Sequence, residues 1–87
     1  MTTLAVRQSV SDFNTWKSVF DEHASVRTGH GSTGDRVLRD GNNVLVLVEF
    51  PDAASAQSFM DDPSLADAMR RGGAQGAPDV SVLTDVA

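Results

Sequence analysis

Cysteine and tyrosine are absent from this sequence of 87 residues, and its aromatic side chains are four Phe and one Trp. Without cysteine, neither a disulfide nor a thiolate-bound metal can stabilise the chain. A chain of this length suits one domain, which we place over residues 1–87, and it buries only about 60–65% of the surface of its unfolded form. We therefore expect a marginal monomer that gains stability by pairing with a second copy.

Basic residues are also scarce: seven Lys and Arg stand against twelve Asp and Glu, a net charge of −5. Such a chain repels polyphosphate, which argues against binding to nucleic acid. No apolar run approaches the roughly 20 residues that cross a bilayer. The start, MTTLAVRQSV, lacks the basic end and the apolar core of a signal peptide. We expect a cytoplasmic protein that binds neither nucleic acid nor membrane.

The first third of the chain predicts a strand followed by a long helix. Residues 3–10 alternate, with Leu4, Val6 and Gln8 on one side of the strand. Ser11 or Asp12 can cap a helix that runs to about Thr28, where a left-handed Gly29 would end it. At 100° per residue this helix has an inward stripe with His23 inside it; the other members are Phe13, Trp16, Phe20, Ala24 and Arg27.

The remainder of the chain predicts a hairpin, two short helices and a last strand. The loop 29–35 leads to a strand over 36–40, a turn over 40–43 and the run VLVLVEF over 44–50, which lacks polar alternation and should be buried on both faces. A helix over 52–61 and another from Pro63 to Gly72 follow. We expect Ala53, Ala56, Phe59 and Met60 to point inward, residues 72–78 to form a loop and residues 80–86 to form the last strand.

This order of elements predicts an α+β domain of ferredoxin-like βαββαβ topology, with a four-stranded antiparallel sheet and helices on one face. The other face of the sheet would expose alternate residues of the 44–50 strand as an apolar patch. Two such faces packed together would cover each other, which predicts a homodimer.

One stretch, V-x-D-F-x-x-W-K-x-x-F-D from Val10 to Asp21, resembles the first helix of many small dimeric α+β-barrel proteins. The resemblance continues through the glycine-rich loop to Gly34, the run VLVLVEFPD and the break Phe59-Met60-x-x-Pro63-x-Leu65. The group includes antibiotic-biosynthesis-type monooxygenases and proteins described as cyclases. The resemblance implies a pocket between the helices and sheet of each subunit, and a dimeric α+β barrel formed by two sheets.

Two histidines are the candidate catalytic residues. His23 lies on the inward stripe of the first helix, where burial favours the neutral imidazole that exchanges protons near pH 7. His30 lies in the loop that follows, and it would reach the same pocket if that loop folded back over the helix end. The alternatives are a core histidine bonded to a backbone carbonyl for His23 and a solvated loop residue for His30.

An apolar wall with one cation is the candidate substrate-binding surface. Its members are Trp16, Phe20, Arg27, Phe59, Met60 and Met69. At helical spacing the alternative is plain hydrophobic core. Arg27 would hold an anionic or enolate oxygen; the alternative leaves its head in water. The faces occupied by Arg7, Arg36 and Glu49 stay open between the pocket and cross-strand ion pairs.

Neither a metal nor a nucleotide cofactor is expected, because no H-x-x-x-H or H-E-x-x-H spacing and no phosphate-binding fingerprint is present. We expect a small-molecule enzyme of secondary metabolism. The resemblance implies a cofactor-independent monooxygenase of an apolar, aromatic or polyketide-like hydroxylated substrate. The alternatives are a polyketide-type cyclase or isomerase that uses the same pocket, a non-catalytic ligand-binding or structural dimer, and a haem-degrading enzyme, suggested by His23 beside Trp16.

Overall fold

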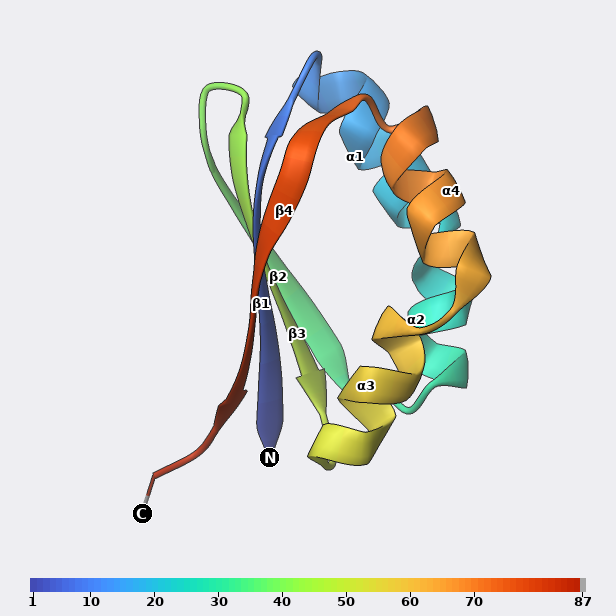
Figure 1. Ribbon diagram of the computed structural model, residues 1–87, viewed down its shortest axis with the longest axis vertical. Coiled ribbons are helices and arrows are strands. Elements are labelled where there is room, and N and C mark those ends of the chain that lie inside the picture. The colour runs from blue at the N-terminus through green and yellow to red at the C-terminus, as the bar shows by residue number, and fades with distance from the viewer. Residues whose placement is uncertain (87) are drawn as a thin grey trace.

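The computed structural model describes residues 1–86. Its elements are β1 (Thr2–Val10), α1 (Phe13–Glu22), α2 (Ala24–Gly29), β2 (Gly34–Asp40), β3 (Asn43–Phe50), α3 (Ala53–Met60), α4 (Pro63–Arg71) and β4 (Ala74–Thr84). The strands form one antiparallel sheet in the order β2-β3-β1-β4. All helices lie on one face of this sheet (Figure 1). The ferredoxin-like α+β fold predicted from the order of elements is confirmed.

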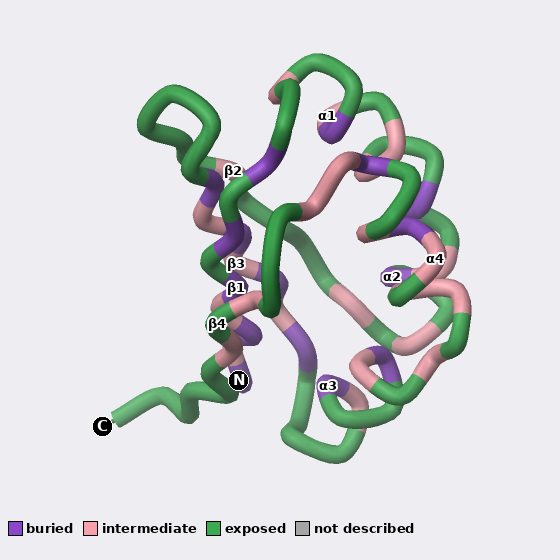
Figure 2. Tube along the Cα trace, turned by 45° about the horizontal axis from the view of Figure 1, so that its top comes forward, coloured by how far each residue is buried: buried purple, intermediate pink, exposed green. Residues whose placement is uncertain are grey.

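The core lies between the inner face of the sheet and the helices, as the buried segments in Figure 2 show. Leu4 and Val6 of β1 pair with Val48 and Val46 of β3, and all four side chains are buried. Trp16 reaches this layer from α1; Ala56, Phe59 and Ala68 reach it from α3 and α4. Ala53, expected to point inward, is exposed.

The helix starts follow the sequence closely. Asp12, Asp52 and Asp62 each accept a hydrogen bond from a backbone N–H of the first turn that follows, at 2.7–2.9 Å. Pro63 occupies the first turn of α4, where its missing N–H costs nothing. Local capping therefore fixes where α1, α3 and α4 begin.

The predicted single helix from residue 12 to 28 is two helices, because His23 interrupts it. The backbone N–H of His23 donates hydrogen bonds to both Val19 O and Phe20 O. The second of these bonds spans three residues in place of four, so the helix tightens at this point into a 3₁₀ turn. Neither Pro nor Gly marks the break. His23 and Arg27 remain on the buried side, whereas Ala24 is exposed and not inward as predicted.

The predicted closure at Gly29 is also wrong; the left-handed residue is Gly31, at φ 97°. The N–H of Gly31 bonds Thr28 O, and the N–H of Ser32 bonds Arg27 O, both at 3.0 Å. This pair of bonds is a Schellman ending, which needs a positive φ one residue beyond the cap. It makes His30 the capping residue, and the chain then leads into β2.

Strand β4 begins at Ala74, six residues before the predicted start. The glycines and the proline of GGAQGAP favour a loop, but this segment pairs with β1 and so extends β4. The pairing is interrupted by a bulge, because Arg7 pairs with Asp79 whereas Ser9 pairs with Gln75. Gly76 takes a φ of 74° there, a conformation that glycine adopts without strain.

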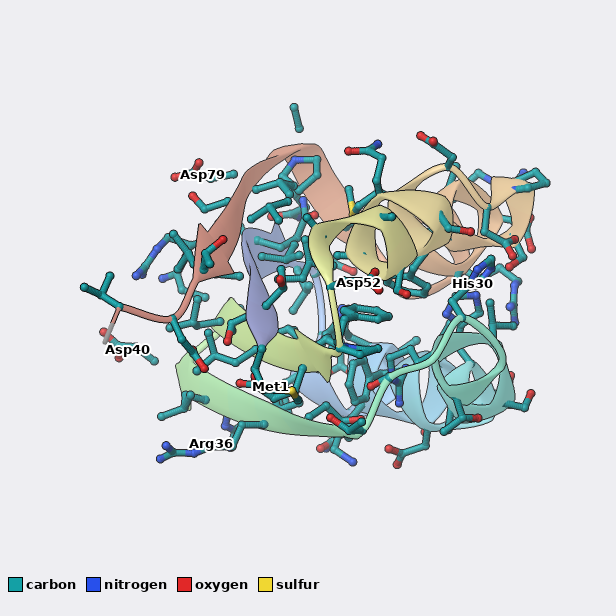
Figure 3. All side chains as sticks on the ribbon, turned by 90° about the horizontal axis from the view of Figure 1, so that it is seen from below. Met1, His30, Arg36, Asp40, Asp52 and Asp79 are labelled. Atoms are coloured by element: carbon teal, nitrogen blue, oxygen red, sulfur yellow. The ribbon has the colours of Figure 1, made fainter. Side chains whose placement is uncertain are left out.

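The second face of β3 is only half-buried, so the expectation that this strand is covered on both faces is not met by one chain. Arg7 pairs with Leu45 and Arg36 pairs with Leu47. Both leucines lie on the same side of β3 as Glu49, so all three charged residues lie on the outer face. Figure 3 shows Arg36 on the side away from the helices. Their assignment to the pocket is excluded by this register. None of the helices over residues 1–86 has the length and apolarity to cross a membrane.

Candidate active site

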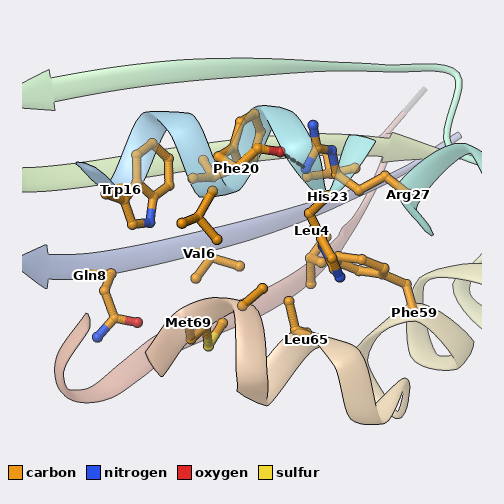
Figure 4. Close-up of a pocket in the computed structure, with 14 residues that line it drawn as sticks. Leu4, Val6, Gln8, Trp16, Phe20, His23, Arg27, Phe59, Leu65 and Met69 are labelled. Atoms are coloured by element: carbon orange, nitrogen blue, oxygen red, sulfur yellow. Dashed lines mark hydrogen bonds between the residues drawn. The ribbon is translucent and has the colours of Figure 1, made fainter. Parts of the chain in front are cut away.

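A cavity of about 70 Å³ lies between the inner face of the sheet and the helices, partly open to solvent (Figure 4). Strands β1 and β3 form its floor, and α1, α2, α3 and α4 form its walls. The lining residues are Leu4, Val6, Gln8, Trp16, Val19, Phe20, His23, Arg27, Val46, Val48, Phe59, Leu65, Ala68 and Met69. The walls are thus almost wholly apolar, with three polar side chains among them.

His23 contributes its imidazole from the break between α1 and α2, and only 7% of the residue is exposed. Its Nε2 is hydrogen-bonded to Ser64 Oγ at 2.9 Å, and its ring lies 5.9 Å from that of Phe59. Burial lowers the pKa of His23 below its ordinary value, and the nearby Arg27 cation lowers it further. The imidazole is therefore neutral at pH 7 and able to accept a proton.

Arg27 lies one helical turn beyond His23 and is only 4% exposed. One guanidinium nitrogen donates to Phe20 O at 2.8 Å, Nε donates to Asp35 at 3.3 Å, and the group stacks 3.7 Å above the Phe20 ring. Burial lowers the pKa of Arg27, and Asp35 opposes that shift. The alternative of a head group in water is thus excluded: the cation is held inside the fold beside His23.

Gln8 is a polar lining residue that the search for reactive groups in the sequence missed. Its Nε2 donates to Gln75 O and Gly76 O of the β4 bulge, at 3.3 and 3.1 Å. Its Oε1 is the one buried side-chain nitrogen or oxygen without a hydrogen-bond partner among residues 1–86. Alternation along β1 placed Gln8 on the same side as Leu4 and Val6. A polar residue on a side that faces the core needs a hydrogen-bond partner there, and this was the signal in the sequence that could have identified Gln8 as a residue of the site.

The polar groups lie at opposite ends of the cavity. Gln8 and Trp16 lie toward one end in Figure 4, whereas His23, Arg27 and Phe59 lie toward the other. An occupant would therefore meet an unpaired hydrogen-bond acceptor at one end and a neutral base beside a cation at the other.

His30 does not line the cavity, so the predicted pairing of two histidines in one pocket is not found. It lies within the helix layer (Figure 3), where Nε2 is 2.7 Å from Asp62 Oδ2 and Nδ1 is 2.9 Å from Ser58 Oγ. Met60 is also absent from the lining, although it packs against the core. The other predicted binding residues, Trp16, Phe20, Arg27, Phe59 and Met69, all line it.

Metal ligands do not gather anywhere in the described part of the chain: residues 1–86 contain no group of three His, Asp or Glu side chains in position to hold an ion. What the cavity offers is general-base chemistry by His23 and electrostatic stabilisation of a developing anion by Arg27.

Comparison with known proteins finds similarity in structure and not in sequence. No family model matches the chain, and no curated protein sequence matches it. Among solved structures, SnoaB, a cofactor-independent oxygenase from Streptomyces nogalater, superposes with a TM-score of 0.81 at 18% identity, over 99% of this chain and 93% of that one. A candidate antibiotic biosynthesis monooxygenase from Bordetella bronchiseptica gives 0.83 at 9% identity, over 99% and 97%.

A protein of unknown function from Nitrosomonas europaea has the same architecture, with a TM-score of 0.78 at 17% identity over 99% of this chain and 89% of that one. The fold is therefore that of the antibiotic-biosynthesis-monooxygenase-like α+β proteins, and the resemblance stated from the sequence is confirmed at the level of the fold. At these identities the likeness concerns the fold alone, so the chemistry has to be argued from the cavity.

Proposed function

We propose that the chain is a cofactor-independent monooxygenase of a small, hydroxylated aromatic compound. The observation that carries the proposal is His23, a neutral base in an apolar cavity with a buried cation beside it. The similarity in fold to an oxygenase that works without a cofactor supports the same reading.

In the proposed reaction His23 removes an acidic proton from an enolisable C–H₂ group of the substrate. The electron-rich anion that results reacts with O₂ directly, and the peroxide formed at that carbon then loses water. One oxygen atom remains in the new C=O group, the other leaves as H₂O, and the four electrons come from the substrate. Apolar walls exclude water from the anion, and Arg27 lowers its energy electrostatically.

Gln8 is the reason for proposing that the substrate carries a hydroxyl group. The buried Oε1 of Gln8 has no hydrogen-bond partner, which costs free energy, and a substrate O–H that donates to it would remove that cost. Phe59 and Trp16 provide aromatic surfaces on which a flat ring can pack.

The cavity must widen for such a substrate. At about 70 Å³ it has room for no more than a few water molecules, whereas sites for drug-sized ligands enclose roughly 300 Å³ or more. The helices α3 and α4 form one wall without belonging to the sheet, so their displacement enlarges the space while leaving the strands in place.

We also propose a homodimer formed through the outer face of the sheet. That face combines apolar and charged side chains, and its apolar members are Ala5, Leu38, Leu45, Leu47 and Leu83. Leu38 and Leu83 are exposed by 38% and 51% in one chain. A second copy packed on this face would cover them and leave the cavity on the helix side free.

Oxygen uptake tests the proposed reaction. With an enolisable, hydroxylated aromatic substrate, we expect uptake by the wild type and a decrease in kcat/KM on the order of 10²- to 10⁴-fold in His23→Gln. Asn14→Ala, on the exposed face of α1, is the control and should retain full activity. Turnover that continues without oxygen would instead support a cyclase or isomerase, and binding without any turnover would support a ligand-binding protein.

A further inference from the structure

The helices α3 and α4, which form one wall of the cavity, are joined to the sheet by the chain at their outer ends only. Helix α3 follows β3 after two residues, and α4 leads through Gly72 and Gly73 into β4. The α3–α4 corner, which we define as residues 58–64, lies about midway between these two attachments along the chain and next to α2 in Figure 1. Contacts across space must therefore keep this corner in place.

The two histidines make the polar contacts between the corner and the first two helices. His30 Nε2 lies 2.7 Å from Asp62 Oδ2, and His30 Nδ1 lies 2.9 Å from Ser58 Oγ. Asp62 is ionised at neutral pH and a carboxylate only accepts, so Nε2 of His30 donates to it. His23 Nε2 lies 2.9 Å from Ser64 Oγ. His30, at the end of α2, thus holds both the last turn of α3 and the start of α4.

One more polar contact joins the two pairs of helices within residues 1–86, between Arg71 and Glu22 at 3.4 Å. Their side chains are 47% and 68% exposed, and ion pairs so exposed contribute little. Arg71 is also the last residue of α4, beside the attachment of the wall at Gly72. This ion pair therefore does not hold the corner.

The corner also carries the aromatic ring that closes one end of the cavity. Phe59 lines the cavity and is only 4% exposed. Its ring lies 5.8 Å from that of Phe50 and 5.9 and 6.1 Å from the rings of His23 and His30. An outward movement of the corner would withdraw Phe59 and enlarge the cavity at that end.

We propose that the α3–α4 corner is the part of the wall that opens to admit an occupant, and that His30 holds it closed. A cavity of about 70 Å³ is too small for one aromatic ring, since a cavity of about 150 Å³ holds benzene. His30 is itself fixed, because its backbone N–H bonds Val26 O and Arg27 O at the end of α2. The proposal concerns entry to the cavity and stands whichever reaction takes place inside.

A single buried thiol can report this opening, because the chain has no cysteine. Val6→Cys places a thiol on the floor of the cavity, where Val6 is 8% exposed. DTNB, an aromatic disulfide reagent too large for the closed cavity, would label this thiol when the wall opens. We expect labelling about 10-fold faster when His30→Ala or Asp62→Ser is added to Val6→Cys. Ser at position 62 still caps α4 but lacks the oxygen that meets His30.

Asp12→Ser is the matched control. Asp12 caps α1 as Asp62 caps α4, accepting from Thr15 N at 2.9 Å, and it contacts neither histidine. Its substitution should leave the labelling rate unchanged. Labelling at low urea concentrations distinguishes local from global opening: the rate should be nearly independent of urea if the corner alone moves, and should rise with urea if the whole chain unfolds.

Labelling in His30→Ala and Asp62→Ser no faster than in Asp12→Ser would overturn the proposal, as would a rate that rises with urea from the lowest concentrations. Acceleration by Arg71→Gln but not by His30→Ala would place the opening at the other end of α4 and would also contradict it. The double variant His30→Ala/Asp62→Ser should label about as fast as His30→Ala alone, since both changes remove the same contact. None of these measurements uses a substrate, so their outcome is independent of the oxygen-uptake test.

Discussion

Three buried polar side chains give the cavity its chemical character, and each is held by different neighbours. Gln8 is fixed by two carbonyls of β4, His23 by a hydroxyl of α4, and Arg27 by a carbonyl of α1 and the carboxylate of Asp35. Buried polar groups are normally satisfied, so the unpaired Oε1 of Gln8 distinguishes this residue from the other two.

The unpaired oxygen of Gln8 predicts a preference between ligands of equal shape. The wild type should bind phenol better than toluene by a ratio that falls about 10-fold in Gln8→Leu, because only the amide oxygen accepts a hydrogen bond from the phenol. Ligand titrations followed by NMR measure both dissociation constants. Gln75→Leu is the control, since the side chain of Gln75 is exposed. An unchanged ratio in Gln8→Leu would show that Oε1 does not meet the ligand.

The buried imidazole of His23 predicts a dependence of stability on pH. Burial, and then Arg27, lowers its pKa from the ordinary 6.5, so between the folded value and 6.5 the unfolded chain binds more protons than the folded one. The free energy of unfolding should therefore decrease as the pH falls below 6.5, with a slope of at most about 1.4 kcal/mol per pH unit.

Urea unfolding of the wild type and of His23→Gln between pH 5 and 8 isolates this contribution. The difference in unfolding free energy between the two proteins should change below pH 6.5 and be constant above it. A wild type that gains stability relative to His23→Gln as the pH falls would mean that His23 is stabilised in its charged form.

At the scale of the elements, the turn before β4 depends on backbone geometry that only glycine allows. Gly73 has a φ of 78°, and a Cβ there would collide with Ser11 Oγ at the end of β1. This turn joins α4 to the bulged part of β4, whose carbonyls hold Gln8. The geometry of one turn thus supports the polar end of the cavity.

Gly73→Ala should consequently lower the free energy of unfolding by about 2 kcal/mol or more. Gly29→Ala is the matched control: the residue ends α2 with an ordinary φ, and its Cβ would meet nothing within 4 Å. It should be neutral or stabilising by about 0.5–1 kcal/mol. Urea unfolding measures both, and equal effects of the two substitutions would contradict the role given to the turn at Gly73.

At the scale of the whole molecule, the helix side of the sheet is covered within one chain and the outer side is not. Leu47 lies near the centre of the outer face, on β3 opposite Ala5 of β1. Because a stable interface buries about 800 Å² on each partner, a charge at its centre should prevent association.

Sedimentation equilibrium tests the proposed dimer. The wild type should have the mass of two 9.2 kDa chains, and Leu47→Arg should have the mass of one. Ser18→Arg adds the same charge to the exposed face of α1 and should remain a dimer. A monomeric wild type, or a dimer that persists in Leu47→Arg, would rule out an interface centred on this face.

Much of the fold could be predicted because the interactions responsible are local. The caps at Asp12, Asp52 and Asp62 each join residues two or three positions apart, and alternation along β1 and β3 gives the buried face directly. The helix break at His23 and the early start of β4 were missed. In both cases the local sequence carries no breaker or strand pattern, and packing on distant partners decides the conformation.

The sequence alone therefore determined the order of elements, the topology and the inward positions of His23 and Arg27, since periodicity and capping act over a few residues. Only the tertiary structure decided which polar atoms meet. Gln8 faces carbonyls 67 and 68 residues away, and His30 meets Asp62, 32 residues away, instead of reaching the cavity. Such contacts depend on how the helices and β4 pack against the sheet, which no local pattern encodes.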